Sequence, residues 1–256
     1  MWKRIKNQIL NLLFPQFCLK CNKEGFLICP DCFSTIDLNP FQYCPFCSVP
    51  NRVIKKGKCQ SHQSFKLNGV FSACDYKNPL VKKMIFLFKY EPYIKNLGFP
   101  LSNLIISHFA LTQKQGIFNS SASSKKAPLA TPSTGSGQVF MPVPLFKKRE
   151  RTRGYNQSAV IAEILSVAYK LPFQKNNLIK IKNTKSQTEF SKKQREQNIA
   201  GAFAIKNPAL ISEKTIFLVD DVFTTGSTME ECARVLKANG AKKVFGIVVA
   251  REGLRI

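Results

Sequence analysis

One segment in the last sixth of the sequence constrains the fold more than any other, because it reads as a strand, a loop, a helix and a second strand. An apolar run over 215–219 leads into two aspartates, and a loop rich in hydroxyl groups follows at 224–228. Ser227 and Glu230 fit a capping box, and a second box is offset by one residue, so we expect a helix to begin there. Gly240 ends that helix before another apolar run. The segment therefore predicts a βαβ unit with parallel strands and a right-handed crossover.

The loop in this unit has the chemistry of a sugar-phosphate site. Free backbone amides, hydroxyl donors and the positive end of a helix dipole all favour one anion at a helix N-terminus. Asp220 and Asp221 precede the loop, at the edge of a parallel sheet where ligands bind, and paired carboxylates accept hydrogen bonds from vicinal sugar hydroxyls. A capped helix preceded by incidental acids is the alternative. The loop residues expected to hold the phosphate are Thr224, Thr225, Gly226, Ser227 and Thr228.

A second strand end also leads into a candidate phosphate contact. An apolar strand over 139–143 is followed by a basic loop that ends in Arg153 and Gly154, before a helix. An arginine can hold two phosphate oxygens through parallel hydrogen bonds, and a glycine permits close approach of the backbone. We therefore expect Arg153 and Gly154 to meet a pyrophosphate group, with a solvated basic turn as the alternative.

The cysteines indicate metal binding. Six of the nine cysteines lie in Cys-x2-Cys pairs, and a seventh lies three residues before a histidine, which is the spacing of metal ligands. Four soft ligands close a tetrahedral zinc site and leave no position for a substrate. We expect two structural zinc ions with sequentially paired ligands, although a cross-braced pairing stays open. The two sets are Cys18, Cys21, Cys29 and Cys32, then Cys44, Cys47, Cys59 and His62. Cys74 and Cys232 are expected to be plain core residues.

These patterns divide the chain into three parts. We expect an amphipathic helix over 1–14, a double zinc-ribbon module over 15–64, and an α/β domain with a parallel, Rossmann-like sheet over 65–256. A stretch at about 119–137 is rich in Ser, Ala, Thr, Pro and Gly and predicts a flexible insertion. No stretch approaches the roughly 20 apolar residues that span a bilayer. Because unpaired thiols need a reducing compartment, we expect a cytoplasmic protein.

The net charge predicts a polyanionic partner. Lys and Arg together number 39 against 15 acidic residues, a formal charge of +24. Such an excess favours nucleic acid or phosphorylated metabolites, whereas a generally lysine-rich proteome is the alternative. Aromatic side chains able to stack bases, or equally to form core, are Tyr43, Phe46, Phe65 and Phe88.

Two motifs resemble those of known families. The segment over 217–228, with its Asp-Asp-x-x-Thr-Thr-Gly-x-Thr pattern, resembles the signature that type I phosphoribosyltransferases use for phosphoribosyl pyrophosphate (PRPP). This resemblance implies that the aspartates bind the ribose hydroxyls, that 224–228 binds the 5-phosphate, and that magnesium accompanies the pyrophosphate. Pro-Val-Pro-Leu at 142–145, Arg-Gly-Tyr-Asn-Gln at 153–157 and both cysteine sets resemble the ComF family over nearly the full chain.

The ComF resemblance also covers the stretch between these motifs. In active type I enzymes this region closes over PRPP, which implies lid roles for Gln187, Arg195 and Asn198, while a polar helix-loop edge is as plausible a reading. No residue is assigned to catalysis. Lys180 and Lys182 stand where arginines are common in the family, which keeps the charge but loses the fork geometry of a bidentate phosphate contact.

The resemblance implies a cytoplasmic PRPP-binding protein that handles incoming single-stranded DNA during natural transformation, alongside a helicase and a recombination mediator. One alternative is an active phosphoribosyltransferase that transfers ribose 5-phosphate to a nitrogen acceptor, although the sequence reveals no element that recognises an acceptor, and a fold alone does not establish turnover. Another alternative is a PRPP-sensing regulator whose zinc module meets duplex DNA. The sequence shows no recognition helix for that role.

Overall fold

The computed structural model describes most of the chain. The expected helix over 1–14, nearly all of the expected insertion, and the lid candidates Gln187 and Arg195 lie outside the described residues. The residues that the structure describes are 15–47, 49, 51–53, 57–118, 137–184 and 197–253.

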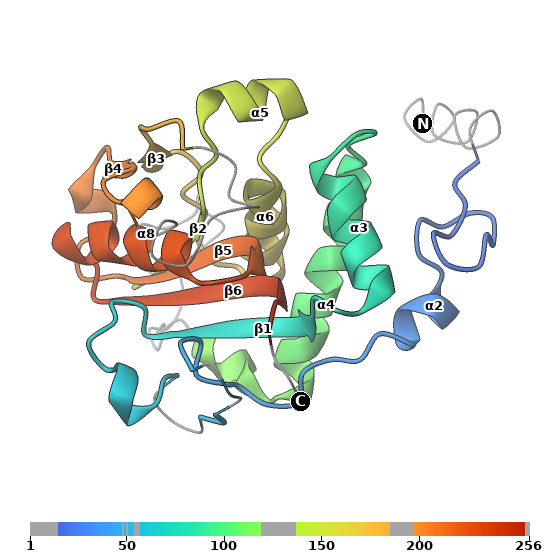
Figure 1. The fold of residues 1–256 in the computed structure, drawn as a ribbon, viewed down its shortest axis with the longest axis horizontal. Coiled ribbons are helices and arrows are strands. Elements are labelled where there is room, and N and C mark those ends of the chain that lie inside the picture. The colour runs from blue at the N-terminus through green and yellow to red at the C-terminus, as the bar shows by residue number, and fades with distance from the viewer. Residues whose placement is uncertain are drawn as a thin grey trace, which may run out of the picture.

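A four-stranded parallel sheet forms the centre of the molecule (Figure 1). Its strand order is β1 (Gly69–Asp75), β6 (Lys243–Arg251), β5 (Thr215–Phe223) and β2 (Gln138–Pro142). The strands are nearly continuous apolar runs, which is typical of a parallel sheet covered on both faces. The predicted class, a parallel sheet with helices, is confirmed, and the segment β5–α8–β6 is the predicted βαβ unit.

Two hydrophobic clusters cover the two faces of this sheet. Phe217 and Val219 of β5 belong to the first cluster, while Ile216 and Leu218 belong to the second, as alternation along a strand requires. The helices α3 (Pro79–Lys89), α4 (Gly98–Leu111) and α6 (Gln157–Tyr169) contribute to the first cluster. The second is formed with α8 (Ser227–Ala238) and the antiparallel pair β3 (Leu178–Lys180) and β4 (Phe203–Ile205). Cys74 and Cys232 are buried, as expected for core residues.

Short helices connect these elements. They are α2 (Pro30–Ser34), η1 (Gln60–His62), η2 (Lys95–Leu97), η3 (Lys114–Phe118), α5 (Lys147–Arg153) and η4 (Pro208–Leu210). The basic segment expected as a loop is therefore the helix α5, which ends at Gly154. Within the described ranges, every helix is too short or too polar to cross a lipid bilayer.

The cysteine-rich part of the chain packs on the sheet domain through apolar contacts, since Cys18, Cys32 and Ile36 belong to the first cluster, and through polar contacts. The guanidinium group of Arg251, at the end of β6, donates to the carbonyls of Cys44 and Pro45, both at 3.1 Å. The carboxylate of Glu230 accepts from the backbone N–H groups of Lys66 and Leu67 at 2.5 and 3.0 Å. The chain that leaves the second cysteine group is thereby fixed against the first turn of α8.

Candidate functional site

The junction between β5 and α8 has the geometry of an anion site. Gly226 adopts φ 81°, in the left-handed region, and a Cβ at this position would lie 2.5 Å from Cζ of Phe223. A glycine is therefore required at the tip of this turn. Gly226 is also the N-cap of α8, and no side chain caps the helix. The first-turn N–H groups have no acceptor within the helix, so they are available to an anion.

The predicted capping boxes do not form. Glu230 bonds the backbone of Lys66 and Leu67, and Glu231 accepts from the backbone N–H of Gly201 and pairs with Arg234 at 2.7 Å. Both boxes are therefore wrong. The physical reason is that long-range partners satisfy both carboxylates, which leaves the start of α8 uncapped.

The two aspartates have separate partners from two helices. Asp221 is 5% exposed, and its Oδ1 lies 2.8 Å from Nζ of Lys89, the last residue of α3. Asp220 accepts at Oδ1 from the hydroxyl of Ser158 in the first turn of α6, at 2.8 Å, and from the backbone N–H of Asp221 at 2.9 Å. Three elements that are distant in the sequence thus meet at the end of β5.

These contacts set the charge of the acid pair. Burial and the neighbouring Asp221 carboxylate raise the pKa of Asp220 to about 7. Burial alone would lower the pKa of Lys89, but the Asp221 and Asp220 carboxylates outweigh it and raise that pKa. Asp220 is therefore poised to ionise near neutral pH, and a bound cation would favour its charged form.

Sequence reasoning missed Lys89 and Ser158. A signal for Lys89 exists, because it lies four residues after the buried Ile85 and next to the buried Phe88 of α3. A charge at that spacing, on the apolar side of a helix, calls for a buried partner. Ser158 offers a weaker signal, since a serine in the first turn of a helix is common for local reasons alone.

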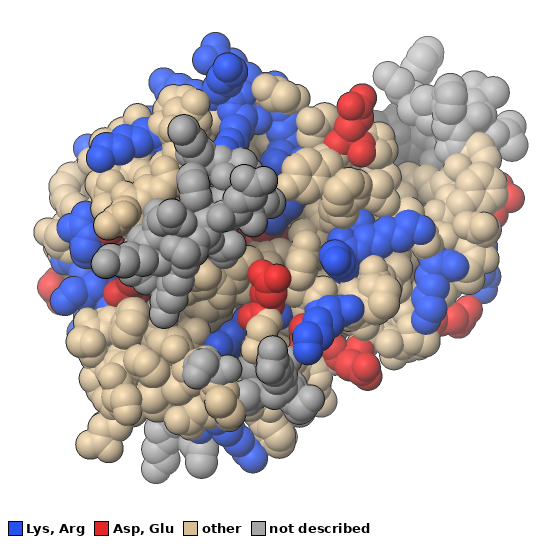
Figure 2. All heavy atoms as spheres, viewed as in Figure 1, with Lys and Arg blue, Asp and Glu red and all other residues tan. Residues whose placement is uncertain are grey.

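A basic cleft adjoins the acid pair. It has a volume of about 410 Å³ and lies between the end of α3 and α5. Arg153 lines it together with Lys89, so the structure brings the predicted pyrophosphate contact to the cleft that also receives the partner of Asp221. Nη1 of Arg153 donates to Oε1 of Gln157 at 2.5 Å, and Gly154 follows with φ 80°. Figure 2 shows Lys and Arg side chains gathered over α5, at the top of the molecule.

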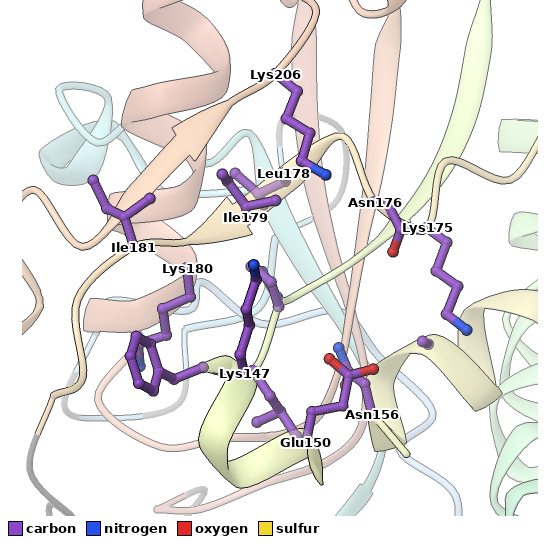
Figure 3. Close-up of a pocket in the computed structure, with 14 residues that line it drawn as sticks. Lys147, Glu150, Asn156, Lys175, Asn176, Leu178, Ile179, Lys180, Ile181 and Lys206 are labelled. Carbon is purple, nitrogen blue, oxygen red and sulfur yellow. The ribbon is translucent and has the colours of Figure 1, made fainter. Parts of the chain in front are cut away.

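A second cavity, also of about 410 Å³, lies between α5 and the β3–β4 pair (Figure 3). The side chains of Lys147 and Lys206 point into this space, and Asn156 lies at its lower edge in the view. Burial and the nearby Arg149 lower the pKa of Lys180, which also lines the cavity. The cationic residues that surround it are Lys147, Lys175, Lys180 and Lys206.

The loop over 224–228, which is predicted to bind phosphate and is called the phosphate loop below, opens into a hollow of about 380 Å³. Thr225, Gly226 and Ser227 line it on one side, and the stacked rings of Phe46 and Phe65 line it on the other, with centroids 3.8 Å apart. The loop is therefore accessible rather than packed shut. The hydroxyls of Thr225 and Ser227 lie 3.0 Å apart, close enough to contact one ligand atom together.

The predicted metal ligands gather in two groups that follow the sequence order. In each group the four donor atoms lie within 4.8 Å of one another. Cys21 Sγ and Cys29 Sγ are 3.5 Å apart, and His62 Nδ1 is 3.1 Å from Cys59 Sγ. Ligands around a tetrahedral zinc ion are separated by about 3.5–3.8 Å. Both groups are thus able to hold a zinc ion, with the sequential grouping rather than the cross-braced one.

Of the three lid candidates, Asn198 is described. It is half-buried and lies next to Ile199, which lines the hollow beside the phosphate loop. Among the aromatic residues considered for base stacking, Phe88 is fully buried core, Phe46 and Phe65 stack on each other, and Tyr43 packs edge-on against Phe41 at 6.5 Å.

Comparison with known proteins agrees with this geometry. Residues 156–254 match the family model of the phosphoribosyl transferase domain. The chain is 36% identical over 110 residues to competence protein F of Haemophilus influenzae, a match that covers 42% of this chain and 47% of that protein. It is 27% identical over 241 residues to the DNA utilization protein YhgH of Salmonella typhimurium, which covers 91% of this chain and 96% of that protein.

A shorter match is to competence protein ComFC of Bacillus subtilis, with 36% identity over 104 residues, 40% of this chain and 39% of that protein. The matches to competence protein F and ComFC thus span about half or less of those proteins, whereas the match to YhgH is nearly end to end. Residues 156–254 thus resemble a phosphoribosyl transferase domain, and the chain is similar to competence protein F, to ComFC and to YhgH.

Proposed function

We propose that this protein binds PRPP with magnesium at the β5–α8 junction and handles single-stranded DNA during DNA uptake. The observation that carries the proposal is the junction itself, where an uncapped helix N-terminus follows a buried acid pair. In this proposal the chain comprises a double zinc-ribbon module over 15–64 and a PRPP-binding domain over 65–256, and the protein is cytoplasmic.

Each part of PRPP has a matching group at this junction. The amides and hydroxyls of 224–228 bind the 5-phosphate, because they surround the positive end of α8. Asp220 and Asp221 accept hydrogen bonds from the ribose hydroxyls. Arg153 and the backbone at Gly154 approach the pyrophosphate from the cleft next to Lys89. Magnesium, when bound, neutralises charge on the pyrophosphate.

The remaining candidates have supporting roles. Asn198, together with Gln187 and Arg195, belongs to a lid that excludes water when PRPP is bound. The two zinc ions are structural, because four protein ligands leave no open coordination position.

The DNA-handling part of the proposal rests on charge and on the relatives. A formal charge of +24 favours a polyanion, and phosphate contacts supply most of the affinity that is independent of base sequence. The relatives carry names that refer to competence and to DNA utilization. Helicase and recombination-mediator partners are part of the proposal through that likeness.

Calorimetric titration with PRPP and magnesium tests the first half, on protein whose zinc content has been measured. We expect saturable binding that weakens about 10-fold or more in Asp221→Asn, since a hydrogen bond to a charged group is worth about 1.5–3 kcal/mol. Phe99→Ala, at an exposed position, serves as the matched control. PRPP binding that Asp221→Asn leaves unchanged contradicts the assignment.

Fluorescence anisotropy with a labelled single strand tests the second half. We expect binding that weakens steadily as salt concentration rises, because binding releases condensed counterions. Affinity weaker than about 10 μM at low salt, with no salt dependence, contradicts DNA handling.

The cavity in Figure 3 favours a second candidate, which is turnover of PRPP with a small acceptor. The cavity has a size suited to a small molecule, and its four lysines favour an anionic acceptor. Incubation with PRPP, magnesium and a panel of bases and other nitrogen nucleophiles tests this candidate. Release of pyrophosphate that depends on one acceptor, and that Asp221→Asn abolishes, supports an enzyme. Absence of release with every acceptor counts against it.

A further inference from the structure

Two aromatic side chains at the end of α3 are unusually exposed. Phe86 is 54% exposed and Tyr90 is 50% exposed, and their ring centroids lie 5.0 Å apart at an interplanar angle of 39°. They are four residues apart, so they stand on the same side of the helix end. Phe88, between them in sequence, is fully buried. The two tilted rings offer an apolar surface to solvent.

Tyr90 lines the basic cleft, and cations from α5 line the same cleft. Arg153 places its guanidinium carbon 5.9 Å from the centroid of the Tyr90 ring, and Lys148 and Arg149 line the same cleft. Among the described residues that line the cleft, none is acidic. The acid nearest to it in the contacts above, Asp221, is held by Lys89. Exposed rings beside a row of cations are the combination that binds single strands, because bases stack while phosphates meet charge.

The other basic groove of the molecule is less suited to a strand. It lies along α8 and has a volume of about 610 Å³. Cations in both places have protein partners, since Lys58 donates to the carbonyl of Gln63 in this groove and Arg149 donates to the carbonyl of Thr184 in the cleft. The aromatic residue of the groove, Phe65, is half-buried against Phe46, whereas Tyr90 in the cleft is 50% exposed. This contrast favours the cleft between α3 and α5.

We infer that the cleft between α3 and α5 is the surface that binds single-stranded DNA. Phe86 and Tyr90 stack on bases, while Lys148 and Arg149 contact the phosphates. The inference rests on the proposed DNA-handling function and names its surface. Because Lys89 lines the cleft and also holds Asp221, a strand bound there reaches the edge of the PRPP site.

A double variant, Phe86→Ala with Tyr90→Ala, tests the stacking surface. Anisotropy with a labelled oligothymidylate of about 20 nucleotides is expected to show a loss of affinity of about 10-fold or more, since stacking contributes about 1–3 kcal/mol per base. Tyr90→Phe keeps the ring and is expected to bind as the unaltered protein does. Lys148→Gln is expected to lower the slope of log affinity against log salt by about 0.7.

Matched controls separate this surface from its neighbours. Phe99→Ala removes another exposed ring, 64% exposed at the start of α4, and Lys237→Gln removes a cation from the α8 groove. Both are expected to leave DNA affinity within about twofold. PRPP titration and zinc content of the double variant are expected to match those of the unaltered protein, which shows that it is folded.

The outcomes distinguish the two proposals. In one outcome the unaltered protein and the double variant bind the strand equally well, whereas Lys237→Gln does not bind it. The strand then follows α8, so the inference is wrong although the proposed function stands. If the unaltered protein itself fails to bind at low salt, the proposed DNA handling and this surface both fall.

Discussion

The cysteine-rich module and the sheet domain are stabilised in different ways. In the described part of the module, the helices have 5 and 3 residues, and the buried apolar side chains are largely the cysteines themselves. In the sheet domain, large side chains such as Phe109, Phe140 and Phe217 are fully buried on the two faces of one sheet. The difference predicts that bonds to zinc stabilise the module, whereas burial of apolar surface stabilises the domain.

The two regions nevertheless meet at the candidate site. Phe46 of the module and Phe65, where the sheet domain begins, form one wall of the hollow beside the phosphate loop. Arg251 of the domain donates to backbone carbonyls next to the second ligand group. We therefore ask whether the module can unfold while the sheet stays folded.

Removal of zinc is expected to have the largest effect. A strong chelator should cost the module about 10 kcal/mol of folding free energy for each site. Hydrogen exchange followed by mass spectrometry should then show loss of protection around Cys18–Cys32 and Cys44–His62, while β5 and β6 stay protected. Simultaneous loss of protection in β5 would contradict this expectation, because the module and the domain would then unfold as one unit.

Truncation of the core is expected to have the converse effect. Phe217→Ala should lower the free energy of unfolding of the sheet domain by about 3–5 kcal/mol, because it opens a cavity beneath β5. Urea denaturation measures this loss, and the zinc content without urea should not change. Val167→Ala, at an exposed position of α6, is the control and should stay within about 0.5 kcal/mol.

Replacement of Arg251 tests the connection between the two regions. Arg251→Met removes the two charge-assisted hydrogen bonds to Cys44 and Pro45 and should cost about 2 kcal/mol. The second ligand group should release zinc to a chelator faster, while the first group is unaffected. Equal release from both groups would mean that Arg251 does not anchor the module.

Asp220→Asn should have an effect on stability whose size depends on pH. The pKa of Asp220 is raised to about 7 from 3.8, so between these values the unfolded chain has lost a proton that the folded protein keeps. The contribution of this group to stability therefore falls as pH rises from about 4 to about 7. The variant lacks this loss, so it should be the more stable of the two proteins at pH 8 and equally stable at pH 4. Urea unfolding across this pH range measures the difference in stability. If the free energies of unfolding of the two proteins change with pH in parallel, the prediction is wrong.

Several aromatic and polar assignments needed the structure. The sequence placed Phe88 among the possible base-stacking residues, but the turn of α3 buries it and exposes Phe86 and Tyr90 instead. It also predicted capping boxes at Ser227 and Thr228. Instead, Glu230 accepts a hydrogen bond from the backbone of Lys66, and Glu231 accepts one from Gly201 and pairs with Arg234. In each case the local pattern permitted two outcomes, and packing between elements selected one.

The sequence by itself determined the two groups of metal ligands and the strand, loop and helix around Gly226, because ligand spacing and turn chemistry act between residues that are close along the chain. Only the tertiary structure decided that Lys89 pairs with Asp221, that Ser158 bonds Asp220, and that a wall of the module faces the phosphate loop. These contacts join residues dozens of positions apart, and the packing of α3 and α6 on one face of a shared sheet sets their geometry.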